Sequence, residues 1–180
     1  MRLNGRCRAC ACMCCRSSGF TLIETIISLA VILLGFVSFL NIYIAQMTLS
    51  EHARNETLAL NDVTRVMERL RQQNAGAGCT LSAAAPAGFA SWDAWLNDTS
   101  ANGGGGKSIQ PNPTTNELIS VTTSGTDPLR VNVATCWRQR ERVIGECTWD
   151  GTQLSASDSN GDGIINSPVA TGVLLTCHSI

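Results

Sequence analysis

The segment from residue 158 to residue 166 carries the side chains best suited to hold a metal ion. It reads Asp-Ser-Asn-Gly-Asp-Gly-Ile-Ile-Asn. Oxygen donors recur at alternate positions: Asp158, Asn160, Asp162, the main-chain carbonyl of Ile164, and Asn166. The series follows the first nine positions of an EF-hand loop, a pattern that suits calcium. Val169 stands where such a loop has its bidentate glutamate, so the predicted structural calcium site is incomplete. Asn-Gly-Asp-Gly is also good turn chemistry, and a solvated turn is the alternative.

A second segment, Gly103–Ser108 (GGGGKS), has half of a phosphate-binding loop. The full pattern needs a glycine where Ala101 stands, together with a flanking strand and helix. Because these conditions are not met, we do not interpret the segment as a nucleotide site. The sequence shows no nucleophile elbow or catalytic triad. It therefore predicts no enzyme, no catalytic residue and no required cofactor.

Three arginines, Arg138, Arg140 and Arg142, alternate beside Trp137. If they extend one strand of a hairpin, they share one face of the sheet. With the tryptophan they would form a candidate patch for an anionic ligand such as DNA or a polysaccharide. The alternative is a charged hairpin tip, because a glutamine and a glutamate stand between the arginines.

The elements that position these residues begin with a membrane-length apolar run. The segment Thr25–Ser50 contains no Asp, Glu, Lys or Arg, and about 20 apolar residues suffice to cross a bilayer. The first 23 residues hold four arginines and no acid, which predicts a cytoplasmic N-terminus and an exported remainder. Glu24 stands at the border, where an unpaired carboxylate costs roughly 2.5–3.5 kcal/mol if it lies deep in the bilayer. It therefore needs a positively charged partner.

The hexapeptide Gly19–Glu24 (GFTLIE) before this run resembles the processing motif of type IV prepilins and type II secretion pseudopilins. The resemblance implies that a prepilin peptidase cuts between Gly19 and Phe20 and then N-methylates Phe20. It also implies that Glu24 meets the N-terminal amine of a neighbouring subunit during assembly. The cleaved leader would be residues 1–19, or a shorter one if translation starts at Met13.

The segment Ala59–Arg71 resembles the post-membrane segment of PilV-type minor pilins, through Asp62 and Met67–Arg69. This resemblance implies a minor pilin of a type IV pilus that takes part in pilus assembly, with adhesion, twitching motility or DNA uptake downstream. Its partners would be the prepilin peptidase/methyltransferase, other major and minor pilins, and the inner membrane. Its C-terminal domain would be periplasmic and later part of the filament at the cell surface. Two alternatives stay open: a minor pseudopilin of a type II secretion system, and a tip adhesin for an anionic ligand.

The predicted leader, residues 1–19, differs from the rest of the chain in its charge and in its cysteines. The leader holds four of the 13 basic residues and none of the 14 acidic ones, so nine basic and 14 acidic residues remain, a net charge of −5. Such a balance argues against general nucleic-acid binding. Five of the nine cysteines lie in the leader, which we interpret as a reduced cytosolic tail. The four exported ones predict two disulfides, with three pairings open. We favour Cys136–Cys147 as a local bridge, which leaves Cys79–Cys177.

The predicted fold is α+β, with one long N-terminal helix packed on a small antiparallel sheet. No proline occurs before Ala85, so the helix is expected to run from Phe20 to about Gln73. Residues 20–49 would span the membrane or form the filament core, residues 50–78 form the amphipathic second half, and residues 79–180 form the exported domain. We expect a short helical turn over Ser91–Leu96. Strands are predicted at Glu117–Thr122, Leu129–Trp137, Arg142–Trp149 and Val169–Cys177. The pilin resemblance implies the same architecture.

Overall fold

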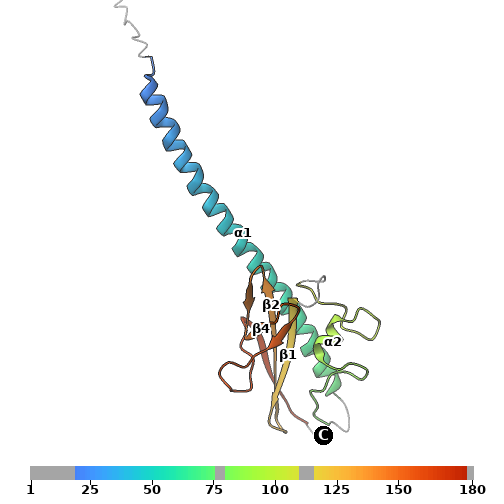
Figure 1. Cartoon of the computed structure of the whole chain (residues 1–180). Helices are drawn as coiled ribbons and strands as arrows, with labels where there is room; N and C mark the ends of the chain where they lie inside the picture. The colour runs from blue at the N-terminus through green and yellow to red at the C-terminus, as the bar shows by residue number, and fades with distance from the viewer. Residues whose placement is uncertain (1–18, 76–79, 110–115, 178–180) are drawn as a thin grey trace, which may run out of the picture. The chain divides into compact units, whose positions relative to one another are not determined.

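The computed structural model describes residues 19–75, 80–109 and 116–177 (Figure 1). It has the predicted α+β fold, in which one long N-terminal helix packs on a small antiparallel sheet. The chain divides into two compact units, Met1–Gln46 and Met47–Ile180. The sheet, the second helix and the hydrophobic core all belong to the unit Met47–Ile180.

The long helix α1 (Leu22–Gln73) is continuous, as the absence of proline predicts. Thr21 caps its start, because its main-chain carbonyl accepts the Glu24 N–H at 3.1 Å and its hydroxyl lies 3.4 Å from the same nitrogen. At the other end Asn74 donates both its main-chain N–H and its side-chain amide to the Leu70 carbonyl, at 3.2 and 2.8 Å. The helix therefore begins slightly after the expected Phe20 and ends where the sequence predicts.

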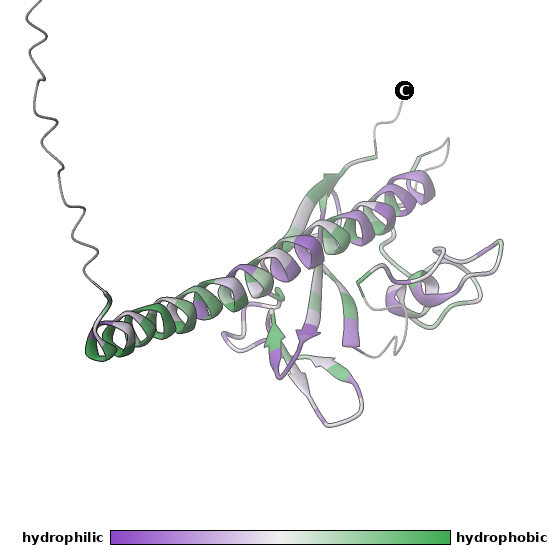
Figure 2. Ribbon diagram, turned by 90° about the horizontal axis from the view of Figure 1, so that it is seen from above, coloured by the Kyte–Doolittle hydropathy of each residue, from purple (hydrophilic) through white to green (hydrophobic). Residues whose placement is uncertain are grey.

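The two parts of α1 differ in character (Figure 2). In the unit Met1–Gln46 its large apolar side chains are exposed, and within the described residues α1 is the one helix long and apolar enough to cross a membrane. In the unit Met47–Ile180 it becomes amphipathic. Buried apolar residues recur there at steps of three and four, at Ala59, Val63, Val66, Met67 and Leu70.

The strands are β1 (Glu117–Ser124), β2 (Leu129–Gln139), β3 (Arg142–Ile144), β4 (Cys147–Trp149), β5 (Leu154–Ala156) and β6 (Val169–Leu175). The central strand is β2, which pairs antiparallel with β1 from Trp137 to Arg130. Its first part pairs with β6, and its last three residues pair with β3. Strands β4 and β5 form a separate two-stranded sheet. Three of the four predicted strands are present, with small differences at their ends.

The predicted strand Arg142–Trp149 is wrong as a single element, because it divides into β3 and β4 around Gly145. Gly145 has φ +96°, and a Cβ there would lie 2.9 Å from the Cys136 sulfur. The chain must turn close to that sulfur, which only glycine allows in this conformation. Strand β5 escaped prediction because it is three residues long and buries only Leu154.

The core joins the second half of α1, the short helix α2 (Trp92–Asn97) and one face of the sheet. The Ser91 hydroxyl caps α2 by accepting the Ala94 N–H at 3.0 Å. Trp92 and Trp95 meet edge to face with ring centroids 5.5 Å apart. The sheet contributes Ile119, Leu129, Val131, Val133, Trp137, Val169 and Leu175. Ile109, in the described part of the chain after α2, belongs to the same core.

Candidate functional site

The predicted processing residues lie at the exposed start of α1. Phe20 is 79% exposed, and a Cβ added to Gly19 would meet no atom within 4 Å. Glu24 lies exposed in the first helical turn, where a carboxylate interacts favourably with the helix dipole. Among the described residues, no packing contact requires the glycine, the exposed phenylalanine or the carboxylate. Their arrangement suits a segment that other molecules recognise.

Large apolar side chains continue this exposed surface along the helix as far as Leu49. Exposed aliphatic and aromatic groups in such number are unfavourable in water. Such a surface fits membrane anchoring.

The predicted calcium loop is exposed and lies between β5 and β6. Asp158 accepts the Gly161 N–H on one carboxylate oxygen and the Gly163 N–H on the other, each at 2.7 Å. These bonds, with the Gly163 N–H as the largest cause, hold the pKa of Asp158 below its ordinary value. The loop therefore keeps this carboxylate ionised.

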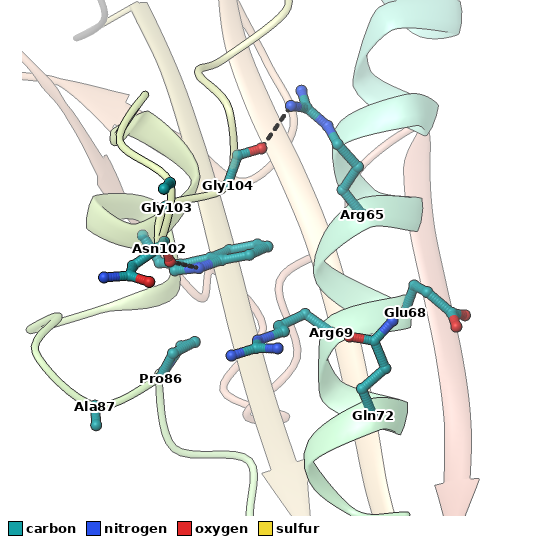
Figure 3. A pocket seen from close by; sticks show the side chains of 11 residues that line it. Arg65, Glu68, Arg69, Gln72, Pro86, Ala87, Asn102, Gly103 and Gly104 are labelled. Atoms are coloured by element: carbon teal, nitrogen blue, oxygen red, sulfur yellow. Dashed lines mark hydrogen bonds between the residues drawn. The ribbon is translucent and has the colours of Figure 1, made fainter.

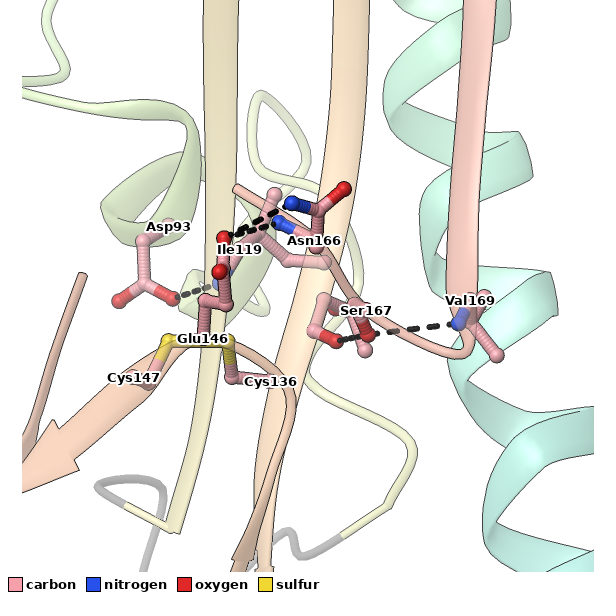
Figure 4. The surroundings of a disulfide bond; sticks show 9 residues. Asp93, Ile119, Cys136, Glu146, Cys147, Asn166, Ser167 and Val169 are labelled. Atoms are coloured by element: carbon pink, nitrogen blue, oxygen red, sulfur yellow. Dashed lines mark hydrogen bonds between the residues drawn. A yellow bond between two sulfur atoms is a disulfide. The ribbon is translucent and has the colours of Figure 1, made fainter. Parts of the chain in front are cut away.

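The other predicted ligands follow the same chain of turns. Asn160 accepts the Asp162 N–H at 3.0 Å, and Asp162 accepts the Ile164 N–H at 2.7 Å. Asn166 instead donates its main-chain and side-chain N–H groups to one oxygen of Glu146, at 2.9 and 3.1 Å (Figure 4). Sequence reasoning missed Glu146, which precedes β4 and lies far from the loop in the sequence.

No group of three or more His, Cys, Asp or Glu side chains that could hold a metal lies within the described residues. The predicted set has only two carboxylates, Asp158 and Asp162, and takes its other oxygens from amides and a carbonyl.

The predicted arginine patch is wrong in its geometry. Trp137 is completely buried in the core, so its ring is not available to a ligand. The chain reverses at the residue pair 140–141, and the register pairs Arg138 with Val143 and Gln139 with Arg142. Because successive residues of a strand point to opposite faces, Arg138 and Arg142 lie on opposite faces of the sheet. Arginines at every second position would share one face only if residues 138–142 formed one uninterrupted strand.

Each arginine has its own surroundings. The Arg138 guanidinium lies 4.8 Å from the ring centre of Trp149 and 3.2 Å from the Glu141 carboxylate. Arg140 pairs with Glu51 of α1 at 3.2 Å. The structure thus separates the candidate ligand patch into a cation–π pair on one face and a hairpin tip that contacts the helix.

The glycine run Gly103–Gly106 has a structural role that the phosphate-loop pattern concealed. Gly104 and Gly106 donate their N–H groups to the Trp95 and Leu96 carbonyls, at 2.7 and 2.8 Å. Both carbonyls belong to the last turn of α2, and the Trp95 carbonyl also accepts the Asp98 N–H at 3.2 Å. A Cβ on Gly104 would lie 2.6 Å from the Leu96 Cα, so the close approach requires glycine.

Lys107 is buried and serves the fold. Its ammonium group lies 2.8 and 2.9 Å from the two carboxylate oxygens of Asp93 and donates to the Glu117 carbonyl at 2.6 Å. The Asp93 carboxylate also accepts the Ile119 N–H at 2.9 Å. This lysine therefore ties α2 to β1 and is not presented to a phosphate.

Asp62 is the second buried charge, with no exposed surface. It accepts the N–H and the hydroxyl of Ser108 at 2.7 and 2.6 Å, and it pairs with Arg65. Beside it, burial raises the pKa of Glu117 to about 9, and the hydrogen bond and charge of Asp62 act in the same direction. The Ile109 N–H and the Lys107 charge oppose this shift only in part. Glu117 therefore holds its proton at neutral pH.

An open pocket of about 610 Å³ lies beside α1 and the segments around α2 (Figure 3). Arg65 and Arg69 line it from α1, and Trp95 lines it from α2. The Arg65 guanidinium donates to the Gly104 carbonyl at 2.7 Å. The residues that line the pocket include neither a nucleophile with an adjacent base nor a pair of catalytic carboxylates.

The disulfide Cys136–Cys147 joins β2 to β4 (Figure 4). It is the local bridge that the sequence favoured, and its two cysteines are 11 positions apart in the sequence. Cys177 is disulfide-bonded. The predicted partner of that residue, Cys79, lies outside the described residues, as do the five leader cysteines.

The described part of the chain thus has one helix of membrane-spanning length, with an exposed start, and a small domain in which helices pack on a sheet. Residues 14–40 match the family model described as the prokaryotic N-terminal methylation motif. This match supports a type IV pilin-like protein that a prepilin peptidase processes. The searches of curated proteins and of solved structures returned no match.

Proposed function

We propose that this chain is a minor pilin of a type IV pilus, of the PilV kind. The observation that carries the proposal is the methylation motif over residues 14–40, which ends within the exposed apolar part of α1. Families with this motif are structural subunits, and the chain would be the substrate of processing chemistry that a partner enzyme performs. The subunit would reside in the inner membrane, with the leader in the cytoplasm and the unit Met47–Ile180 in the periplasm.

Processing would hydrolyse the amide bond between Gly19 and Phe20, with one water consumed, to give a carboxylate on Gly19 and a new amine on Phe20. The enzyme would then transfer a methyl group from a methyl donor to that amine, which would lose a proton. This amine is positively charged, so it is a suitable partner for a carboxylate in an apolar setting. Glu24 lies one helical turn further along α1. A neighbouring pilin would therefore bring its N-terminal amine to Glu24 when the apolar helices pack side by side.

The segment Ala59–Arg71, which resembles PilV-type minor pilins, joins α1 to the folded domain. Asp62 and Met67 are buried against the folded domain, whereas Glu68 and Arg69 remain exposed. Asp62 holds Ser108 on the helix, so this segment is where the domain is fastened to α1. A minor role, in starting the filament or forming its tip, is our interpretation of that likeness.

Substitution of the processing glycine tests the proposal. We expect Gly19→Ala to leave the chain at precursor mass, because the peptidase recognises the residue before the cut. Gly35→Ala is the matched control, since this helical glycine also has no atom within 4 Å of an added Cβ. A Gly19→Ala protein of normal mature mass would show that the motif is not the processing site.

Substitution of the carboxylate tests assembly separately. We expect Glu24→Gln to be processed normally but to be nearly absent from filaments sheared from cells, with Glu68→Gln, at an exposed position further along α1, as the matched control. Equal amounts of both variants in the filaments would contradict the docking role of Glu24.

A further inference from the structure

The tip of the β2–β3 hairpin, Gln139–Arg142, is fastened to α1 at one place. The Gln139 side-chain oxygen lies 3.1 Å from His52 Nδ1, and Arg140 lies 3.2 Å from the Glu51 carboxylate. The uncharged run Thr25–Ser50 ends immediately before these helix residues. About 20 residues cross the hydrocarbon core of a bilayer, so the end of this run emerges among the headgroups. The hairpin tip is thereby held at the level of the membrane surface.

The hairpin tip has two arginines and one acid, Glu141, so its net charge is +1, although the chain after the leader has a net charge of −5. Glu141 points its carboxylate to Arg138 of β2, at 3.2 Å. Arg140 is paired with Glu51, yet its side chain is 57% exposed. Arg142 is exposed and has no ion-pair partner within the described part of the chain. Arg54 of α1 is also exposed. An acidic protein thus presents arginines where it meets a membrane.

The backbone of Arg140 gives a second, independent observation. Among the described residues it is the one non-glycine residue with positive φ, at 56°. A turn position of this kind favours glycine or asparagine, and a larger side chain is held there at a cost in free energy. Strained residues of this kind are often found at functional sites, which suggests that the Arg140 guanidinium has a binding role.

The shape of the surface agrees with its charge. A hollow of about 600 Å³ lies between the hairpin tip and the helix. Leu49 and Ile144 supply apolar walls, and Arg140 and Arg142 supply cations. Arginine binds phosphate through paired N–H donors, and the apolar walls suit the glycerol and the first carbons of the acyl chains.

We propose that this surface binds the headgroup of an anionic phospholipid, with Arg140 and Arg142 on the phosphate. The proposal rests on the proposed membrane anchoring of the chain. Headgroup binding would hold the folded unit on the bilayer until the subunit enters a filament. Glu51 competes with the phosphate for Arg140 and therefore limits the affinity.

Native mass spectrometry of the full chain released from detergent micelles tests this. The probes are phosphatidylglycerol and phosphatidylcholine, titrated separately. We expect the wild type to prefer phosphatidylglycerol, and each arginine to contribute roughly five-fold in affinity. Arg140→Gln/Arg142→Gln should therefore bind phosphatidylglycerol roughly 25-fold more weakly. Glu51→Gln should bind it more tightly than the wild type.

The matched control is Arg71→Gln/Arg130→Gln, which removes the same charge from exposed positions away from the hairpin tip. It should stay within about two-fold of the wild type, and the four leader arginines are common to all variants. Equal binding of both lipids by the wild type, or unchanged binding by the hairpin variant, would overturn the proposal. So would a hairpin variant that keeps its lipid preference but no longer cross-links to other pilins, which would indicate a subunit contact instead.

Two further readouts keep the result interpretable. Tryptophan fluorescence reports whether each variant is folded, since all four tryptophans lie in the unit Met47–Ile180. The N-terminal mass, measured on the same samples, reports on processing. The hairpin tip lies outside the methylation motif at residues 14–40. A wild-type protein with a correctly processed N-terminus but no preference for phosphatidylglycerol would therefore overturn the headgroup site and leave the proposed function untouched.

Discussion

Replacement of Glu117 by glutamine should make the protein more stable at neutral pH, because the wild-type carboxyl is kept protonated by its surroundings. In the folded state its pKa is about 9, against an ordinary value of 4.5. Below pH 4.5 both the folded and the unfolded chain hold the proton, and the group costs nothing. Between pH 4.5 and 9 only the folded chain holds it, so stability falls as the pH rises.

The magnitude follows from the interval between the two pKa values. Each pH unit above 4.5 removes about 1.4 kcal/mol, so this group lowers the free energy of unfolding by about 3 kcal/mol at pH 7. A glutamine at this position can accept the Ile109 N–H, as the wild-type carboxyl does at 3.2 Å. It can also donate to the Asp62 carboxylate, but it does not titrate. The variant should therefore match the wild type near pH 4 and exceed it increasingly up to pH 9.

Urea unfolding of the full chain in detergent, followed by tryptophan fluorescence from pH 4 to 9, measures this difference. Glu68→Gln is the matched control, because Glu68 is exposed and lies 3.8 Å from Arg71. Such a surface pair contributes about 0–1 kcal/mol with little dependence on pH in this range. Parallel stability curves for the wild type and Glu117→Gln between pH 5 and 8 would refute the reasoning.

Three further predictions concern the rest of the folded unit. Replacing Cys136 and Cys147 together by serine should lower the free energy of unfolding by about 2–4 kcal/mol, measured by urea titration, and equal midpoints would contradict a stabilising bridge. Lys107→Met should cost about 3–5 kcal/mol, because it leaves Asp93 without its buried partner; adding Asp93→Asn should recover part of the loss if the pair is the cause. For the loop at residues 158–166 we propose structural calcium, which should raise stability by about 1.4 kcal/mol when free calcium is ten times its dissociation constant. Identical melting with calcium and with chelator would count against that site.

The elements predicted from the sequence are those that a pattern of neighbouring residues marks. Absence of proline and the change from an apolar run to an amphipathic pattern were enough to place α1. Alternating β-branched residues located β1, β2 and β6, because each strand has seven or more residues. The disulfide Cys136–Cys147 was favoured from sequence proximity.

Sequence reasoning missed the features that depend on residues distant in the chain. Asp62 and Glu117 meet only because the tertiary fold brings the start of β1, together with Ser108 and Ile109, next to α1. No local pattern marks either acid as buried. The three arginines looked like one face because their alternation continues through a turn that has neither asparagine nor glycine. Arg140 occupies that turn in a strained conformation, so the propensity rule failed at a position where we infer a function.

Mass spectrometry of the N-terminus of the mature protein, purified from the cells that make it, tests the central claim most directly. We expect a chain that begins at Phe20 with one methyl group on its amine and lacks residues 1–19. A mature chain that retains the leader, or that begins at another residue, would contradict the assignment of a processed, pilin-like subunit.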